Sequence, residues 1–150
     1  MVESIKRFEI RAAKEKDLKD IGKLINYLMK AERVDNIRKQ TDLIIENRIN
    51  PTFSGNKNKV FIAEYNKKAL GLALVEIKHG LVASIPYLVV DPCCQKMGVG
   101  RKLVNHVAKY AKSQKIRILE VLIHKDNKKS RKFHEKLGFH LFGFTLRKKI

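Results

Sequence analysis

The stretch Gln95-Lys96-Met97-Gly98-Val99-Gly100 separates an almost entirely apolar segment, residues 83–90, from an amphipathic segment, residues 99–111. The first predicts a strand near the centre of a sheet and the second predicts a helix. A turn from a strand into a helix directs unpaired backbone N–H groups and the positive end of the helix dipole at one spot. Glycine at 98 and at 100 lets the backbone come close to an anion. The stretch therefore predicts a phosphate-binding loop.

Two common phosphate motifs do not fit this loop. The spacing GxxxxGK[ST] of a P-loop is absent, and so is the GxGxxG of a dinucleotide-binding turn. The alternative is a helix start that uses two glycines only for tight packing.

The segments around the loop indicate one α+β domain over residues 1–150, because no repeat or Pro/Gly/Ser-rich linker interrupts them. Their expected order is β-α-α-β-β-β-α-β-α-β. Strands are expected at residues 7–13, 60–65, 69–78, 83–90, 116–123 and 141–146, and helices at residues 17–30, 34–49, 99–111 and 127–137.

The composition is strongly basic. The chain of 150 residues carries 33 Lys and Arg against 15 Asp and Glu, a formal net charge of +18. Two thirds of this excess lies in residues 76–150, with +12 against +6 in the first half. Such a field favours anionic partners, including nucleotides and nucleic acid.

No segment predicts membrane insertion or secretion, because the longest uncharged stretch, residues 80–90, contains a proline and the N-terminus lacks an apolar core. The only cysteines, Cys93 and Cys94, are adjacent, so they frame no disulfide scaffold and no zinc spacing. We expect a cytoplasmic protein without a metal.

Three motifs resemble those of the GNAT superfamily of N-acetyltransferases. Gln95-x-x-Gly98-x-Gly100 is similar to the [RQ]-x-x-G-x-[GA] loop with which that family holds the pyrophosphate of acetyl-CoA. The LVVDP of residues 88–92 is similar to the family's L-x-V-x-P, and residues 127–139 to its N-x-x-A-x-x-[FL]-Y-x-[KR]-x-G-F. The resemblance implies a mixed, mostly antiparallel sheet of six to seven strands, with helices on both faces and splayed central strands.

The resemblance also implies how acetyl-CoA is bound. Leu88 and Val90 would offer main-chain groups to the pantetheine arm, and the Val90 N–H would lie near the thioester carbonyl. Asn127 would contact the arm or order a water, and Phe133 would pack on it. The expected binding residues are Leu88, Val89, Val90, Gln95, Lys96, Met97, Gly98, Val99, Gly100, Arg101, Asn127 and Phe133.

The chain departs from the family at the residue that usually donates a proton to the leaving thiolate, because His134 replaces the usual Tyr. His134 either takes that role, since its pKa lies near 7, or is a tolerated helix residue. Tyr87 is a second candidate for the acid. Glu76 and His124 are candidates for the base that deprotonates the amine. An acyl-cysteine mechanism at Cys93 or Cys94 is not expected, because no base is paired with them.

These inferences predict an acetyl-CoA-dependent N-acetyltransferase that acts by direct attack of a primary amine, either a small molecule or a protein Lys or N-terminus. The acceptor pocket is expected at residues 26–53 and 139–146, where Glu32, Asp35, Asp42 and Glu46 either attract a cationic amine or form a solvated helix face. Two alternatives stay open: a CoA-binding module with weak catalysis, and an acetyltransferase of nucleic-acid-associated protein. Similar proteins are commonly dimers, so a homodimer is one expected state.

Overall fold

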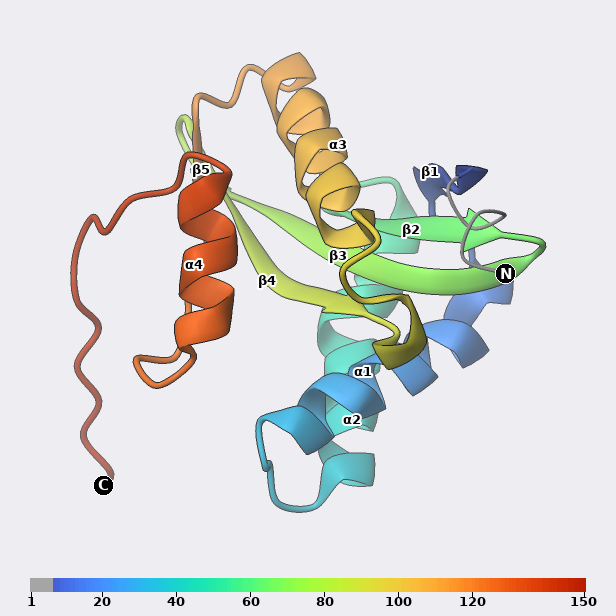
Figure 1. The fold of residues 1–150 in the computed structure, drawn as a ribbon, viewed down its shortest axis with the longest axis horizontal. Helices are drawn as coiled ribbons and strands as arrows, with labels where there is room; N and C mark the ends of the chain where they lie inside the picture. The colour runs from blue at the N-terminus through green and yellow to red at the C-terminus, as the bar shows by residue number, and fades with distance from the viewer. Residues whose placement is uncertain (1–6) are drawn as a thin grey trace.

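The computed structural model describes residues 7–150 and contains one five-stranded sheet with helices on both faces (Figure 1). The strands lie in chain order, and all neighbours are antiparallel except β4 and β5, which are parallel. Their bounds are β1 Glu9–Ala12, β2 Lys59–Tyr65, β3 Lys68–His79, β4 Val82–Val90 and β5 Ile118–Glu120. The predicted α+β class and the predicted order of helices and strands along the chain through α4 are thus confirmed.

Alternating apolar residues give the sheet two buried faces. Val60, Ile62, Leu72 and Leu74 pack on the side of α1 (Leu18–Ala31) and α2 (Ile37–Ile44). Their neighbours Phe61, Ala63, Ala73 and Val75 pack on the side of α3 (Val99–Ser113). Because successive strand residues point to opposite faces, this pattern sandwiches the sheet between two helical layers.

The helix predicted over residues 34–49 is interrupted. Asn36 adopts φ 55°, so the helix starts only at Ile37, and from Ile45 to Ile49 it widens into a π-helix. A 3-10 helix, Asn50–Ser54, follows with Pro51 in its first turn, where a missing N–H costs nothing. The fourth helix, α4, spans Lys128–Lys136. Among residues 7–150 no helix is both long and apolar enough to cross a membrane.

Strand β4 has a bulge and an early end to its pairing with β5. Leu74 pairs with Tyr87 and Glu76 pairs with Ser84, so β4 carries one extra residue near Pro86. The pairing between β4 and β5 covers only Val82 to Ser84 on the β4 side. Beyond the bulge, the edge of β4 that faces β5 is therefore unpaired within the described residues.

The prediction of a strand over residues 141–146, and with it a sheet of six to seven strands, was wrong for the described chain. The residues of this segment are exposed, and it pairs with no described strand. The alternating pattern alone is insufficient, because a strand also needs a hydrogen-bonded neighbour. The strand predicted over 116–123 shortens to Ile118–Glu120 for the same reason, since no other described residue continues its ladder.

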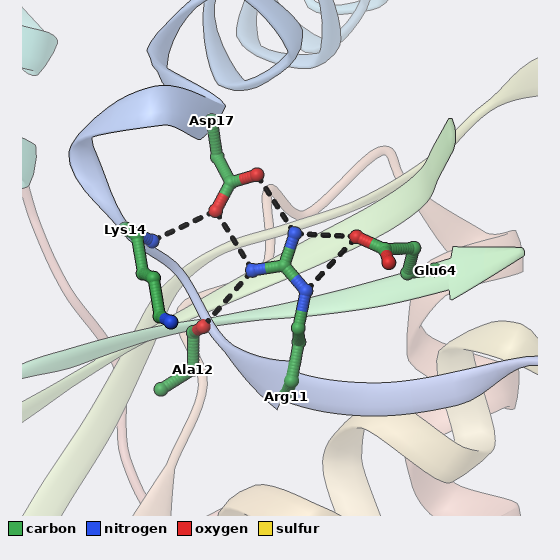
Figure 2. A network of polar contacts seen from close by, with 5 residues as sticks. All are labelled: Arg11, Ala12, Lys14, Asp17 and Glu64. Atoms are coloured by element: carbon green, nitrogen blue, oxygen red, sulfur yellow. Dashed lines mark hydrogen bonds and ion pairs between the residues drawn. The ribbon is translucent and has the colours of Figure 1, made fainter. Parts of the chain in front are cut away.

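Strand β1 is tied to the body through Arg11 (Figure 2). Its guanidinium donates two hydrogen bonds of 2.8 Å to the buried carboxylate of Asp17, at the start of α1, and also pairs with Glu64 on β2. Hydrogen bonding to Arg11 lowers the pKa of Asp17 despite its burial. The network fixes the first strand against both the sheet and the first helix.

A prediction concerns Gly71 on β3, where the backbone of β4 leaves no room for a side chain. A Cβ there would lie 2.8 Å from the Val89 carbonyl oxygen. We expect Gly71→Ala to lower the free energy of unfolding by about 1–3 kcal/mol, because backbone must move. Gly22→Ala is the control: its Cβ would make an ordinary 3.6 Å contact in α1, and it should stabilise by about 0.5–1 kcal/mol. Urea unfolding of both variants tests this, and equal effects would contradict it.

Candidate active site

The loop of residues 95–98 leads into α3 through two left-handed residues. Lys96 has φ 67° and Gly98, the N-cap of α3, has φ 82°. No side chain caps the helix, and within residues 7–150 the amide N–H groups of Val99, Gly100 and Arg101 donate no hydrogen bond. Left-handed turns next to free helix N–H groups form a concave site for an anion. We call residues 95–101 the anion loop.

The two glycines of the anion loop serve different purposes. At Gly98 a side chain would be strained by the positive φ and would lie 3.9 Å from the Arg101 guanidinium. At Gly100 a Cβ would meet the Phe133 ring at 3.1 Å and Val90 at 3.7 Å. Gly98 thus shapes the turn, and Gly100 lets α3 approach both β4 and α4.

Basic side chains surround the anion loop, and the first turn of α3 has no acidic residue. The Arg101 guanidinium folds back toward Gly98, and Lys129 Nζ of α4 lies 3.5 Å from Gln95 Oε1. Lys102 points elsewhere, with its Nζ 4.7 Å from the centre of the Phe8 ring. Arg101 and Lys129 are therefore the cations placed beside the free N–H groups.

Main-chain groups of β4 face the open edge next to this loop. The Asp91 N–H donates to the Leu70 carbonyl at 2.7 Å, so Asp91 and, by alternation, Val89 direct their backbone polar groups toward β3. Leu88 and Val90 then direct theirs to the opposite edge, which β5 leaves unpaired. An extended ligand can add to this edge as a strand does.

Helix α4 forms the wall opposite. Phe133, half-buried, packs over Gly100. Asn127 caps the helix, its side-chain oxygen accepting a hydrogen bond from the Ser130 N–H at 3.0 Å. The amide NH₂ of Asn127 makes no hydrogen bond within the described residues and can donate to another partner.

His134 is buried on the same helix. Its Nδ1 lies 2.8 Å from the Ser130 carbonyl oxygen, and because a carbonyl only accepts, Nδ1 carries the proton. The buried Nε2 has no partner among the described residues. Burial lowers the pKa of His134, and the hydrogen bond to Ser130 offsets this only in part. At neutral pH the ring is therefore mainly uncharged and has no proton on Nε2.

A polar cluster of Arg48, Glu76 and Tyr87 lies on the α1–α2 face. The Arg48 guanidinium holds both carboxylate oxygens of Glu76, donates to the Tyr87 hydroxyl at 3.2 Å, and lies 5.1 Å from that ring's centre. Hydrogen bonding to Glu76 raises the pKa of Arg48. The structure thus brings together two of the predicted catalytic residues, Glu76 and Tyr87. We call these three residues the arginine cluster.

Sequence reasoning missed two residues near Glu76. Arg48 belongs to no recognisable motif. It reaches Glu76 from the π-helix, and the sequence does not reveal this helix distortion. Ser84, opposite Glu76 on β4, has a buried hydroxyl without a partner among the described residues. The other candidates lie apart: His124 is exposed beside Asp126, and the acidic residues proposed for the acceptor pocket are all exposed.

The two cysteines form a separate group before the anion loop. The two Sγ atoms are 3.2 Å apart, and Asp91 adds a carboxylate to the group. Interaction with Asp91, and then with Cys94, raises the pKa of Cys93 to about 12. A thiol that stays protonated is a poor nucleophile and a poor metal ligand.

Comparison with known proteins gives consistent results. Residues 23–139 match the model of the acetyltransferase (GNAT) family. An uncharacterized N-acetyltransferase of Methanocaldococcus jannaschii is 33% identical over 85 residues, which are 53% of this chain and 38% of that protein.

Solved structures share the fold at low identity. A transcriptional regulator from Bacillus halodurans superposes with a TM-score of 0.81 at 18% identity, covering 96% of this chain and 100% of that one. Aminoglycoside N-acetyltransferase AAC(6')-Iy, solved with a bisubstrate analogue of CoA, superposes with a TM-score of 0.75 at 20% identity. The match covers 96% of this chain and 99% of that one. Since the family model covers most of the chain, including the open β4 edge and the anion loop, the chain belongs to the GNAT family of acetyltransferases.

Proposed function

We propose that the protein transfers an acetyl group from acetyl-CoA to a primary amine, with both substrates bound at once. The observation that carries the proposal is the set of free N–H groups in the anion loop, which adjoins the open edge of β4. The loop would hold the pyrophosphate, with Arg101 and Lys129 beside it. Leu88 and Val90 would pair with the pantetheine arm, and Phe133 would pack on it.

The two halves of the site lie on the two faces of the sheet. The anion loop and Phe133 belong to the α3 side, whereas Tyr87 packs on the α1–α2 side. The open edge between β4 and β5 connects these sides. The thioester would reach this opening from the α3 side, and the amine would approach from the arginine cluster.

We assign Glu76 as the general base that deprotonates the amine. A lysine-like amine with a pKa of about 10.4 must lose a proton at neutral pH, which costs about 4.6 kcal/mol. The Glu76 side chain is 16% exposed and is held by Arg48. An incoming ammonium would compete with Arg48 for this carboxylate, which would then accept the amine proton directly or through a water.

Tyr87 is better suited than His134 to donate a proton to the leaving thiolate. The Tyr87 oxygen accepts from Arg48, which leaves its own O–H free to donate. Neutral His134 carries its proton on Nδ1, where Ser130 holds it. The Val90 N–H would stabilise the charge that develops on the thioester oxygen. The thiolate of CoA needs little help to leave, since a thiol has a pKa of about 8.5.

The anion loop is tested by comparing two glycines with nearly the same backbone. Gly98 has φ 82°, and Gly55, which ends the Asn50–Ser54 turn, has φ 83° with no atom within 4 Å of where a Cβ would lie. Alanine at either site should cost similar stability, about 1 kcal/mol. Only Gly98→Ala should weaken acetyl-CoA binding in calorimetry, by about tenfold or more. Equal affinities in the two variants would contradict the loop's role.

The base is tested with Glu76→Gln in an amine panel that detects acetylated products by mass. We expect kcat to fall by about 100-fold, the usual cost of losing a general base, while the Kd of acetyl-CoA changes little. Glu46→Gln, on the exposed face of the π-helix, is the matched control and should retain wild-type kcat. If no amine reacts although acetyl-CoA binds, the protein is a binding module and the proposed transfer is wrong.

The state of His134 is tested by pH. Because its folded-state pKa is lowered from 6.5, the unfolded chain takes up this proton first on acidification. Its contribution to stability is complete above about pH 6.5 and is lost as the pH falls toward the lower folded-state value. Between pH 7 and pH 5, the free energy of unfolding should fall less in His134→Phe than in wild type. Urea unfolding at both pH values measures this difference. An NMR titration midpoint for His134 at or above 6.5 would contradict this.

A further inference from the structure

One segment of the chain, from just before the anion loop into β5, carries only positive charge. Residues 92–119 contain seven Lys and Arg and no Asp or Glu, whereas residues 18–49 in the other helical layer contain seven Lys and Arg and five Asp and Glu. No Lys or Arg between residues 92 and 119 forms an ion pair with a described residue. Like charges without a counter-ion repel one another and favour binding of an anion.

Four of these cations lie at the end of α3 that is farther from the anion loop, where the chain crosses to β5 (Figure 1). Lys109 and Lys112 are exposed on α3, and Lys115 and Arg117 are exposed in the connection that follows. Since α3 has 15 residues, about 20 Å separate its two ends. The proposed coenzyme site therefore does not account for these four residues, which we call the basic end.

The basic end borders a hollow of about 920 Å³. Lys112, Lys115 and Arg117 line it, together with apolar residues of α3, β5 and the turn between β3 and β4. The backbone of this frame is fixed, because Lys115 has φ 64° and the N–H groups of Arg117 and Ile118 both donate to the Leu81 carbonyl, at 2.9 and 3.0 Å. Three cations are thus held around one concave surface.

The helix dipole explains only part of this arrangement. A cation in the last turn of a helix is favourable, and Lys112 lies in the last turn of α3. The effect fades beyond that turn, so it does not explain Lys115 or Arg117. Burial, and then repulsion from Lys109, lower the pKa of His106, as expected where positive charge is not neutralised.

We propose that the basic end binds the phosphodiester backbone of nucleic acid, without regard to base sequence. Lys and Arg side chains only donate hydrogen bonds and the other lining side chains are apolar, so the hollow suits a ligand that presents acceptors. Phosphodiester oxygens are such acceptors and carry charge at regular intervals.

Other anionic partners suit the hollow less well. A peptide would also present backbone N–H groups, and no lining side chain is an acceptor for them. A flat bilayer would not enter a concave surface. No lining residue is aromatic, so no base would stack there, and binding would be independent of sequence.

Nucleic acid and acetyl-CoA would occupy opposite ends of α3, so both would bind at once. The inference therefore does not depend on acetyl transfer. Nucleic acid held at the basic end would place the amine site beside other proteins on the same nucleic acid, and these offer Lys and N-terminal amines.

The test measures binding of a short fluorescein-labelled DNA duplex, and of an RNA duplex of the same sequence, by fluorescence anisotropy at several salt concentrations. Wild type should bind both duplexes at low salt. Combining Lys112→Gln, Lys115→Gln and Arg117→Gln should weaken binding by about tenfold or more and reduce the slope of log K against log salt by about 2 to 3. This variant should bind acetyl-CoA with the wild-type Kd.

The matched control combines Lys19→Gln, Lys23→Gln and Lys30→Gln, which are exposed lysines of α1 in the other helical layer. Both triple variants lose three positive charges, so a difference between them reports on position and not on net charge. The control should bind nucleic acid within about threefold of wild type, because salt screens distant charges. Circular dichroism checks that both variants are folded.

Four results would overturn the proposal. Wild type that binds neither duplex at low salt lacks the site. Equal losses in the two triple variants would mean that net charge alone attracts nucleic acid. Displacement of the duplex by saturating acetyl-CoA would place its phosphates in the anion loop. Tighter binding to phosphatidylserine vesicles or to polyglutamate would assign the basic end to a membrane or to an acidic peptide.

Discussion

The short pairing between β4 and β5 is the constraint on which the rest of the site depends. The bulge near Pro86 ends the ladder after Ser84, so the following residues of β4 keep one edge unpaired. A buried strand normally satisfies the polar groups of both edges. Here the groups of Leu88 and Val90 are left for a ligand, and the same strand leads directly into the anion loop. Under the proposed function, affinity for an extended, phosphorylated molecule would follow from backbone geometry more than from particular side chains.

The other parts of the molecule hold this opening in place. Gly71 lets β3 approach the backbone of β4, and Gly100 lets α3 approach the same strand beneath Phe133. On the other face, the π-helix places Arg48 over Glu76 and Tyr87. Glycines thereby position the half of the site that would bind the coenzyme, whereas a helix distortion positions the half that would receive the amine.

The sequence was most informative where function depends on the backbone. The two glycines and the apolar strand before them predicted the anion loop, and apolar runs bounded by turn residues predicted β2, β3 and β4 nearly to their ends. Pro86 inside an apolar strand is a signal of the bulge that the sequence analysis did not use, since proline cannot complete a ladder. The arginine cluster was harder to foresee, because the contact between Arg48 and Glu76 joins residues 28 apart through a π-helix. Residues 141–146 show another limit of the sequence. Their residue pattern is typical of a strand, but a pattern cannot show whether a neighbouring strand is there to pair with.

The most direct test of the central claim is an amide NMR titration of the protein with acetyl-CoA, which reports on each backbone N–H separately. The account predicts saturable shifts that are largest at Val90 and at Val99 to Arg101, with smaller shifts at Phe133. Amides of the Asn50–Ser54 turn, which lies in the other helical layer, should stay unchanged. Shifts concentrated away from the anion loop, or no saturable shift at all, would contradict it.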